Sequence, residues 1–439
     1  MGSGTGFARE RNRELGLLIL IIVLTFVGFV AVQLAKDGKI APFSFIYPGC
    51  VAAVFIILHL VLRFLTPRAD SLLLPVSAGL TSLGIVMIYR LDTGLALDQL
   101  VWIAVAAACF VLVILFLRNY EVLAQYKYTL GIAALALLAS TMIFGKEING
   151  ARLWLQIGPL HFQPSEIAKV LLVVFLAAFF AEKHEVLSIS THRVLGIPVP
   201  ELKYFVPLVI MWGMSVLMMI FQKDLGSSLL FFGIFLAMLY AATARKTYVA
   251  VGLVLFVLGA YVCYLSFSHV EVRVLTWLSP FNPKTIQGDS YQISQSLFAL
   301  SSGGISGSGL GLGRPDFIPS VATDFIFSAI GEELGLIGAV SVILLYMVFV
   351  ARGIKTALLH RDDFGKLLAV GLVSIIAIQS FLIMGGVTRL IPLTGITLPF
   401  VSYGGSSLLA NFVLLGLLLV LSHRGATTNV ESIREGARK

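Results

Sequence analysis

Twelve long apolar runs dominate this sequence and limit what the chain can fold into. Each has 16 to 26 residues, and most are long enough to cross the hydrocarbon core of a bilayer as a helix. Of the 439 residues 58% are hydrophobic and only 12% are charged, about half the charged share of soluble domains. We therefore predict an all-α polytopic membrane protein with about 12 transmembrane helices, and we exclude disordered, fibrous and disulfide-rich secreted classes. The runs lie at 15–35, 43–65, 72–89, 97–117, 128–144, 166–181, 204–221, 225–243, 247–267, 325–350, 367–388 and 406–422.

The positions of the lysines and arginines predict the orientation of the chain. With the N-terminus in the cytoplasm, the inner segments hold 20 of the 31 basic residues and the outer loops hold 10, while Lys169 lies inside the sixth run. The positive-inside rule then places both termini in the cytoplasm. The net charge of +8 is explained by loops that face anionic membrane lipids. The sequence contains no run of five or six basic residues, so it gives no indication of nucleic acid as a partner.

The unusual residues collect on the predicted outer side. They lie in a segment at about 145–165, a very long loop at about 268–324 and a stretch at 389–405. We expect the long loop to be structureless and functional. The stretch 389–405 is too apolar for an ordinary loop and too rich in proline and glycine for a helix, so it is predicted to be re-entrant backbone. Within it, Ser402 and Tyr403 are candidates to face a substrate.

Charged residues near the first outer segment allow two interpretations each. Arg152 lies in a segment, 149–159, that suits an interfacial strand or an amphipathic helix. Glu166 and Lys169 share one helix face, where they either neutralise each other or line a polar cavity. Asp224 either caps the helix that follows it or contacts substrate.

The long loop contains a glycine-rich run, 301–313, that matches no nucleotide-binding fingerprint. It is either a flexible connector or a nest of backbone amides that approaches a phosphate. Arg273 and Arg314, on either side of this run, are candidates to serve a pyrophosphate.

Three further candidates are the acidic residues Asp324, Glu332 and Glu333, at the end of the long loop and in the predicted helix after it. Asp324 lies at the start of a predicted helix. Its side chain either caps that helix or faces a substrate. Glu332 and Glu333 lie about 12 Å further along it, near the outer boundary of the membrane. Adjacent carboxylates there are costly unless they meet a polar substrate, a metal or basic partners. The sequence does not decide which of these two glutamates faces a cavity.

The order of these motifs resembles the SEDS family (shape, elongation, division and sporulation), the FtsW/RodA/SpoVE-type peptidoglycan glycosyltransferases. The resemblance covers roughly residues 80–424. It implies an enzyme that polymerises lipid II into glycan strands at the outer face of the bacterial cytoplasmic membrane, with a class B penicillin-binding protein as crosslinking partner. The motifs that carry it are Asn-Gly-Ala-Arg152, Gln-Pro-Ser-Glu166-Ile-Ala-Lys169, Asp224-Leu-Gly, Thr-Asp324-Phe-Ile-Phe, Gly-Glu-Glu333-Leu-Gly and Leu-Pro-Phe-Val-Ser-Tyr-Gly-Gly-Ser-Ser.

Carried over position by position, Asp324 resembles the catalytic aspartate of the family. The family's other recurrent charged positions match Arg152, Glu166, Lys169, Asp224, Arg273 and Glu333.

The chain departs from the family in three places. Lys223 replaces a common proline, and Ser320 replaces a common glutamate. Two helices near the N-terminus look additional, so we expect residues 1–70 to form a tail with two extra helices, 71–424 the glycosyltransferase membrane domain and 425–439 a cytoplasmic tail. This extension is more similar to an elongation (RodA) member than to a division (FtsW) member.

The chemistry implied by the resemblance suits these residues. We hypothesise that Asp324 deprotonates the acceptor 4-hydroxyl of an undecaprenyl-linked glycan, or holds a divalent cation (Mg²⁺ or Mn²⁺) that activates it. Arg273 and other outer cations would offset the charge of the departing pyrophosphate, and a single displacement would invert the anomeric centre. The alternatives are a lipid II flippase or a secondary transporter, followed by a scaffold without enzymatic activity.

Overall fold

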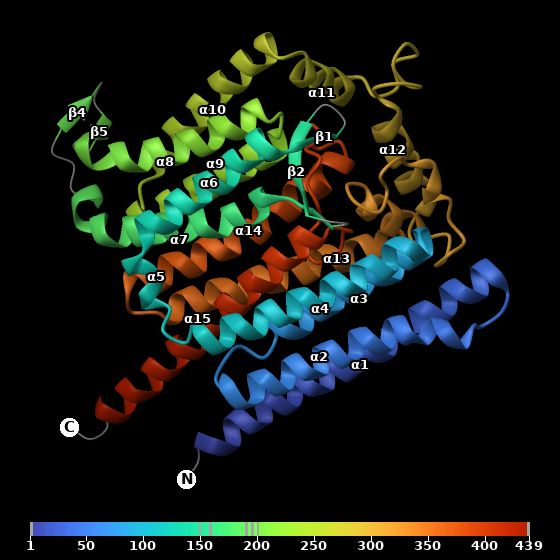
Figure 1. The fold of residues 1–439 in the computed structure, drawn as a ribbon, viewed down its shortest axis with the longest axis horizontal. Helices are drawn as coiled ribbons and strands as arrows, with labels where there is room; N and C mark the ends of the chain where they lie inside the picture. Colours follow the sequence, from blue (N-terminus) through green and yellow to red (C-terminus); the bar gives the residue numbers. More distant parts are fainter. Residues whose placement is uncertain are drawn as a thin grey trace. The chain divides into compact units, whose positions relative to one another are not determined.

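The computed structural model describes residues 3–148, 151–157, 160–188, 192–194, 197–199 and 202–436, and these are mostly helical (Figure 1). Among them, eleven helices are long and apolar enough to cross a membrane, and α8 contains a shorter apolar stretch, Val209–Phe221. Together these twelve match the predicted runs, so the prediction of an all-α polytopic membrane protein is confirmed. The helices of the spans are α1 (Ser3–Asp37), α2 (Ile46–Leu65), α3 (Leu73–Leu91), α4 (Thr93–Phe116), α6 (Lys127–Phe144), α7 (Pro164–Ser188), α8 (Leu202–Phe221), α9 (Leu225–Thr243), α10 (Lys246–Ser266), α13 (Ile326–Leu359), α14 (Asp363–Val387) and α15 (Gly405–Gly436).

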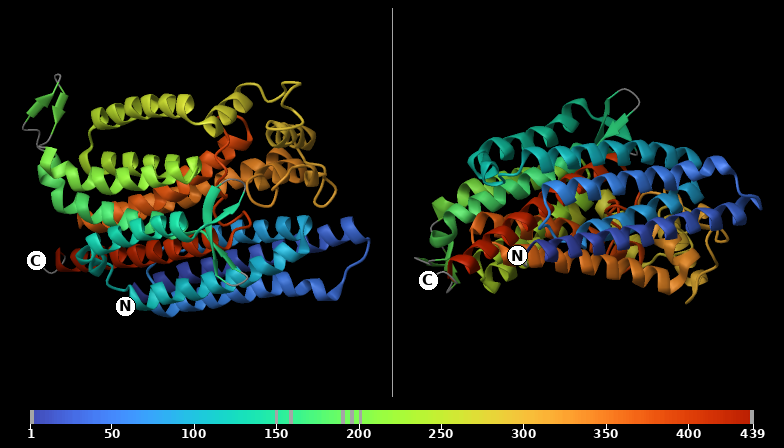
Figure 2. Two further views of the ribbon diagram at one scale, coloured as in Figure 1. Left: turned by 45° about the horizontal axis from the view of Figure 1, so that its top comes forward. Right: turned by 90° about the horizontal axis from the view of Figure 1, so that it is seen from below.

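The connections hold short strands and helices. Strands β1 (Lys146–Ile148), β2 (Ala151–Ile157) and β3 (Leu160–Phe162) form an antiparallel sheet in that order, so the segment around Arg152 is a strand. Strands β4 (His192–Val194) and β5 (Ile197–Val199) form a hairpin between α7 and α8 (Figure 2). The short helix α5 (Glu121–Gln125) precedes α6.

The expectation of a structureless loop at 268–324 is wrong. It contains α11 (Ser268–Leu278), α12 (Tyr291–Gly303) and a 3-10 turn at Pro315–Phe317. The buried residues of α12 recur at helical spacing, as in Ile293, Ser296 and Ala299. Short amphipathic helices of this kind escape a search for apolar runs long enough to span a membrane.

Some predictions fall on residues that the structure does not describe. Asn149 and Gly150, at the start of the first outer motif, lie outside the described residues, as do residues 437–439 of the predicted C-terminal tail. The rest of that predicted tail continues α15 as helix to Gly436.

The chain divides into two compact units. Unit 1 comprises Met1–Arg118, Leu275–Gly353 and Gln379–Lys439, and unit 2 comprises Asn119–Val274 and Ile354–Ile378. In unit 1, α4 packs along α15, and the hairpin of α1 and α2 packs on α3 and α4 (Figure 2). In unit 2, α6 packs along α7, and α7 and α8 pack on α9.

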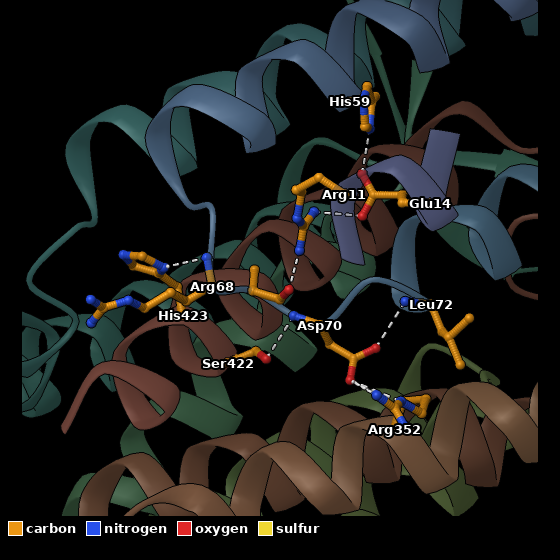
Figure 3. A network of polar contacts seen from close by, with 10 residues as sticks. Arg11, Glu14, His59, Arg68, Asp70, Leu72, Arg352, Ser422 and His423 are labelled. Carbon is orange, nitrogen blue, oxygen red and sulfur yellow. Dashed lines mark hydrogen bonds and ion pairs between the residues drawn. The ribbon is translucent and has the colours of Figure 1, made fainter. Parts of the chain in front are cut away.

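A buried charge network joins α1 to α2 at one end of unit 1 (Figure 3). Arg11 donates to Glu14 at 2.5 Å and to the carbonyl of Ala69, and Glu14 also lies 2.7 Å from Nδ1 of His59. Arg11, Glu14 and His59 are almost completely buried. Because buried charges require partners, this network fixes the start of α1 against α2 and against the α2–α3 connection.

The same connection also holds the distal part of α15 (Figure 3). The backbone N–H of Asp70 donates to the Ser422 hydroxyl at 3.0 Å, and the N–H of Arg68 donates to Nδ1 of His423 at 3.2 Å. The first described turns of α1 and this part of α15 therefore lie at the same end of unit 1, which is the arrangement that the predicted orientation requires.

Glu14→Gln should destabilise the protein, because it leaves Arg11 buried without a charged partner. We expect a loss on the order of 3 kcal/mol, measured by thermal unfolding in detergent. The matched control is Arg63→Gln on the same hairpin, since Arg63 makes an exposed hydrogen bond to Asn12 and should change stability by less than about 0.5 kcal/mol. Equal effects of the two variants would contradict the role of the buried network.

Candidate active site

A buried ion pair lies at the end of α3 opposite to this network. Nε of Arg90 donates to Oε1 of Glu333 at 2.6 Å, and the Arg90 guanidinium also donates to the carbonyl of Gly313 at 2.6 Å. The second oxygen of Glu333 accepts from the N–H of Gly311 at 2.9 Å. The Glu333 side chain is fully buried. These bonds therefore satisfy both of its oxygens and pair its charge inside the protein.

The neighbouring carboxylate is bound by the same glycine-rich run. Oε1 of Glu332 accepts from the N–H of Arg314 at 2.6 Å. The run therefore binds anions through its backbone amides, but the anions are two carboxylates of this chain. The alternative of a flexible connector is wrong, because the run is fastened to α13 by these bonds.

A break in α13 explains why the run needs glycines. Gly335 has a φ of 67°, and the helix hydrogen bonds that this conformation interrupts are replaced by bonds to the run. The N–H groups of Ser308 and Gly309 donate to the carbonyls of Glu332 and Glu333, and the N–H of Leu336 donates to the carbonyl of Gly304. A Cβ on Gly335 would lie 2.3 Å from the nitrogen of Gly307, so no larger residue fits there.

The predicted re-entrant stretch is confirmed as non-helical backbone that other parts of unit 1 satisfy. The Tyr346 hydroxyl donates to the carbonyl of Pro399 at 2.5 Å, and the Gln379 amide donates to the carbonyl of Thr397 at 2.8 Å. The buried amide of Gln99, on α4, donates to the carbonyl of Ser402 and accepts from the N–H of Gly404, both at 3.3 Å.

This stretch in turn fixes the backbone immediately before Asp324. The Ser402 hydroxyl donates to the carbonyl of Thr323 at 2.5 Å, and the N–H of Tyr403 donates to the carbonyl of Ala322 at 2.8 Å. The N–H of Asp324 donates to Ser320 at 3.2 Å. Asp324 is half-buried, two residues before α13 begins, so its carboxylate projects from backbone that is held on its N-terminal side.

The two candidates on this stretch differ in their surroundings. The buried Ser402 hydroxyl also accepts from the N–H of Leu398 at 2.9 Å, so it is committed to holding backbone. Tyr403 is half-buried, and burial raises the pKa of its hydroxyl, which the charges of Asp98 and Asp92 raise further. The Tyr403 hydroxyl therefore stays protonated at neutral pH and is a hydrogen-bond donor.

Unit 2 holds a second cluster of predicted site residues. Glu166 and Lys169 form a buried pair at 2.5 Å. Asp224 caps α9, since its Oδ1 accepts from the N–H of Ser227 at 3.0 Å, and its Oδ2 is buried with no hydrogen-bond partner in the described part of the chain. The helix-capping interpretation of Asp224 is thus confirmed, and one carboxylate oxygen remains for another interaction.

The pKa of the Asp224 carboxyl depends on its burial and on other members of this cluster. Burial raises its pKa, the bonds from Ser227 oppose this rise, and the charges of Glu166 and Arg273 raise and lower it respectively. Glu166 and Arg273 therefore act on the charge of Asp224 in opposite directions. Arg152 lies on β2 with its side chain exposed.

The structure thus places Asp324, Glu333, Ser402 and Tyr403 in unit 1, and it places Arg152, Glu166, Lys169, Asp224 and Arg273 in unit 2. Sequence reasoning missed Arg90 and Gln99 in unit 1. The available signal was a single arginine ending an apolar run and a single glutamine inside the next one. Both are costly at membrane depth without a partner.

Comparison with known proteins assigns the family. The sequence matches the FtsW/RodA/SpoVE family, described as cell cycle proteins, over residues 70–426. The chain belongs to this family. It is 44% identical over 427 residues to the peptidoglycan glycosyltransferase RodA of Mycobacterium tuberculosis, covering 94% of this chain and 91% of that protein.

Solved structures agree with this assignment. One comes from a peptidoglycan synthase complex that coordinates polymerization and crosslinking, with a TM-score of 0.64, 29% identity and coverage of 81% of this chain and 98% of that chain. Another is the rod shape determining protein RodA of Thermus thermophilus, with a TM-score of 0.58, 28% identity and coverage of 81% and 97%.

The share of this chain that is matched differs among its relatives, and it is 81% for the Thermus thermophilus RodA as well as for an FtsW protein. The FtsW protein of Geobacter metallireducens is 33% identical over 81% of this chain and 95% of its own length. The match to the M. tuberculosis RodA covers 94% of this chain, which is possible only if it includes residues before the family region starts at residue 70. The α1–α2 hairpin is therefore at least partly shared with that RodA.

Asp224→Asn should make the protein more stable at neutral pH and less active. Asparagine caps a helix as well as aspartate does, and it removes the buried charge. A carboxyl with a raised folded-state pKa contributes stability that is complete below its ordinary value of 3.8 and is lost as the pH rises through the folded-state pKa. The gain in thermal stability should therefore grow from acidic to neutral buffer.

Asp224→Ala is the matched control, because it removes the charge and the cap together. We expect its stability gain at neutral pH to be smaller than that of the asparagine variant by about 1 kcal/mol. A stability difference between Asp224→Asn and the parent that does not change with pH would show that the Asp224 carboxyl is not perturbed by burial.

Proposed function

We propose that this chain is a RodA-type peptidoglycan glycosyltransferase that polymerises lipid II into glycan strands during cell elongation. The family match and the RodA relatives support the class of reaction. The observation that carries the proposal is the placement of Asp324, a half-buried carboxylate on backbone that Ser402 and Tyr403 hold in place.

Asp324 is suited to act as a general base. Glycosyl transfer needs a group that takes the proton of the acceptor 4-hydroxyl while the bond to the departing pyrophosphate breaks. Unlike Glu333, which is fully buried and paired with Arg90, Asp324 is partly accessible. The two glutamates below it are used in holding the glycine-rich run, so Asp324 is the acid of this end of unit 1 that we assign to the reaction.

We propose substrate-binding roles for the other candidate residues. The Tyr403 hydroxyl would donate a hydrogen bond to a sugar or phosphate oxygen. Arg152 and Arg273 would offset pyrophosphate charge. Lys169 is buried and paired with Glu166, so this pair and Asp224 would support the site without meeting the phosphates directly.

The residues support a divalent cation at this site less than they support Asp324 as a general base. In the part of the chain that the structure describes, no three His, Cys, Asp or Glu side chains are grouped closely enough to hold a metal ion. A complete protein cage for Mg²⁺ or Mn²⁺ is therefore missing among these residues.

Orientation and partner extend the same proposal. The excess of lysine and arginine in alternate loops supports cytoplasmic termini and an active face outside the cytoplasmic membrane. The α1 and α15 segments that meet the α2–α3 connection support termini on one side. A class B penicillin-binding protein is the partner we propose, since a solved relative comes from a complex that couples polymerization to crosslinking.

Purified protein incubated with lipid II and its transpeptidase partner should form glycan polymer, and Asp324→Asn should lower the rate about 100-fold or more. Polymer length and amount are measured by gel electrophoresis of labelled product. The matched control is Asp289→Asn, an exposed aspartate in the same outer loop, which should polymerise at the parent rate.

The competing functions predict other outcomes. A lipid II flippase or a transporter would move lipid II between the leaflets of a vesicle and yield no polymer. The absence of polymer with the partner present, together with measurable translocation, would therefore overturn the proposed function.

A further inference from the structure

We propose that the α1–α2 hairpin is a positioning element for the active site, which fixes the glycine-rich run and Arg90 from outside the common family region. The inference rests on the proposed glycosyltransferase function. The family match starts at residue 70, and the hairpin precedes it in the sequence. The observations that carry the inference are three contacts of the hairpin within unit 1.

The first contact joins α1 to the run at the residue that binds Glu333. A Cβ on Gly311 would lie 2.8 Å from the Cβ of Ala35 and 3.5 Å from the Cα of Val32. Gly311 also has a φ of 80°, and its N–H donates to the Glu333 carboxylate. The end of α1 therefore lies directly against the amide that completes the buried carboxylate's hydrogen bonds.

The second contact joins the hairpin to the residue before Arg90. The ring of Tyr89 lies 4.9 Å, between centroids, from the rings of both Phe29 and Tyr47. The Tyr89 hydroxyl donates to the Ser44 hydroxyl at 2.9 Å. Residues from α1, α2 and the turn between them thus surround the last turn of α3, where Arg90 projects toward Glu333.

The third contact fixes the position of α1 along its own axis. At the opposite end of the unit Arg11 donates to the carbonyl of Ala69 in the α2–α3 connection, and Glu14 bonds Arg11 and His59 (Figure 3). Arg11 and Val32 are about 32 Å apart along the helix. An apolar helix can slide against lipid at little cost, whereas buried charges cannot leave their partners. The network therefore sets the height at which Ala35 meets Gly311.

These contacts have a mechanical consequence for the site. A shift of α1 by one residue moves its end by about 1.5 Å, which either presses Ala35 into the run or opens a gap beside it. The run carries the amides that bind Glu332 and Glu333, and it leads to the segment before Asp324. The hairpin acts through the run, so its residues are positioning residues and do not touch substrate.

A double-variant experiment in the full-length protein separates positioning from general strain. Gly311→Ala adds a methyl group that collides with Ala35, and Ala35→Gly makes room for it. We expect Gly311→Ala to lower kcat for lipid II polymerisation about tenfold or more with little change in KM. Addition of Ala35→Gly should recover the part of the lost rate that the collision causes, while the strain of an alanine at a φ of 80° remains.

Gly309→Ala is the matched control. Gly309 lies in the same run with a φ of 101°, but its added Cβ would meet only the side chain of Leu312, at 3.1 Å. Ala35→Gly should therefore recover nothing of the rate that Gly309→Ala loses. If Gly311→Ala fails to fold, Ala35→Leu tests the same contact from α1 and should lower kcat, while Leu34→Ala, at an exposed neighbouring position, should not.

The outcomes distinguish the two proposals. Polymer from the parent protein, with Ala35→Gly rescuing neither glycine variant or both equally, would overturn the positioning role and leave the proposed function standing. If Gly311→Ala does not fold, an unchanged kcat in Ala35→Leu would likewise overturn the positioning role. No polymer from the parent protein with its partner would overturn the proposed function, and the positioning role with it.

Discussion

The buried carboxylate of Glu333 is the group on which the outer end of unit 1 depends. A carboxylate at this depth is stable only if its charge is paired and its oxygens are hydrogen-bonded. Arg90 supplies the charge and Gly311 supplies an amide. Since these partners come from α3 and from the glycine-rich run, satisfying one side chain joins three segments that are far apart in the sequence.

The same requirement shapes the backbone around the site. A membrane protein has to bond every backbone group that it places away from water. The break at Gly335 is bonded by the glycine-rich run, and the re-entrant stretch is bonded by Gln99, Tyr346 and Gln379. Irregular backbone is thereby made rigid, and Asp324 projects from a segment that this rigid backbone holds.

Much of this arrangement could be predicted from the sequence, because some signals are local. The apolar runs gave the spans, since each has the length that the bilayer demands. The i,i+3 spacing placed Glu166 and Lys169 on one helix face, with pairing as one of two interpretations, and the position of Asp224 allowed a helix cap as one of two. The proline and glycine content of 389–405 predicted re-entrant backbone.

The rest depends on contacts between distant residues. Arg90 and Glu333 are 243 residues apart, and no local pattern connects them. The glycines of 301–313 looked like a connector or a phosphate nest because the broken helix that they bind was not visible in the sequence. The helices α11 and α12 were missed because they are too short to register as spans.

The most direct test of this account is a double-mutant cycle on Arg90 and Glu333, read as the initial rate of lipid II polymerisation. Arg90→Met leaves the buried Glu333 carboxylate without its positively charged partner, and Glu333→Gln leaves Arg90 without its negatively charged one. We expect each variant to lower the rate about tenfold, equivalent to about 1.4 kcal/mol. The double variant should lose far less than the product of the two single losses, because no buried charge is left unpaired. Losses that simply multiply would contradict the claim that this ion pair positions the active site.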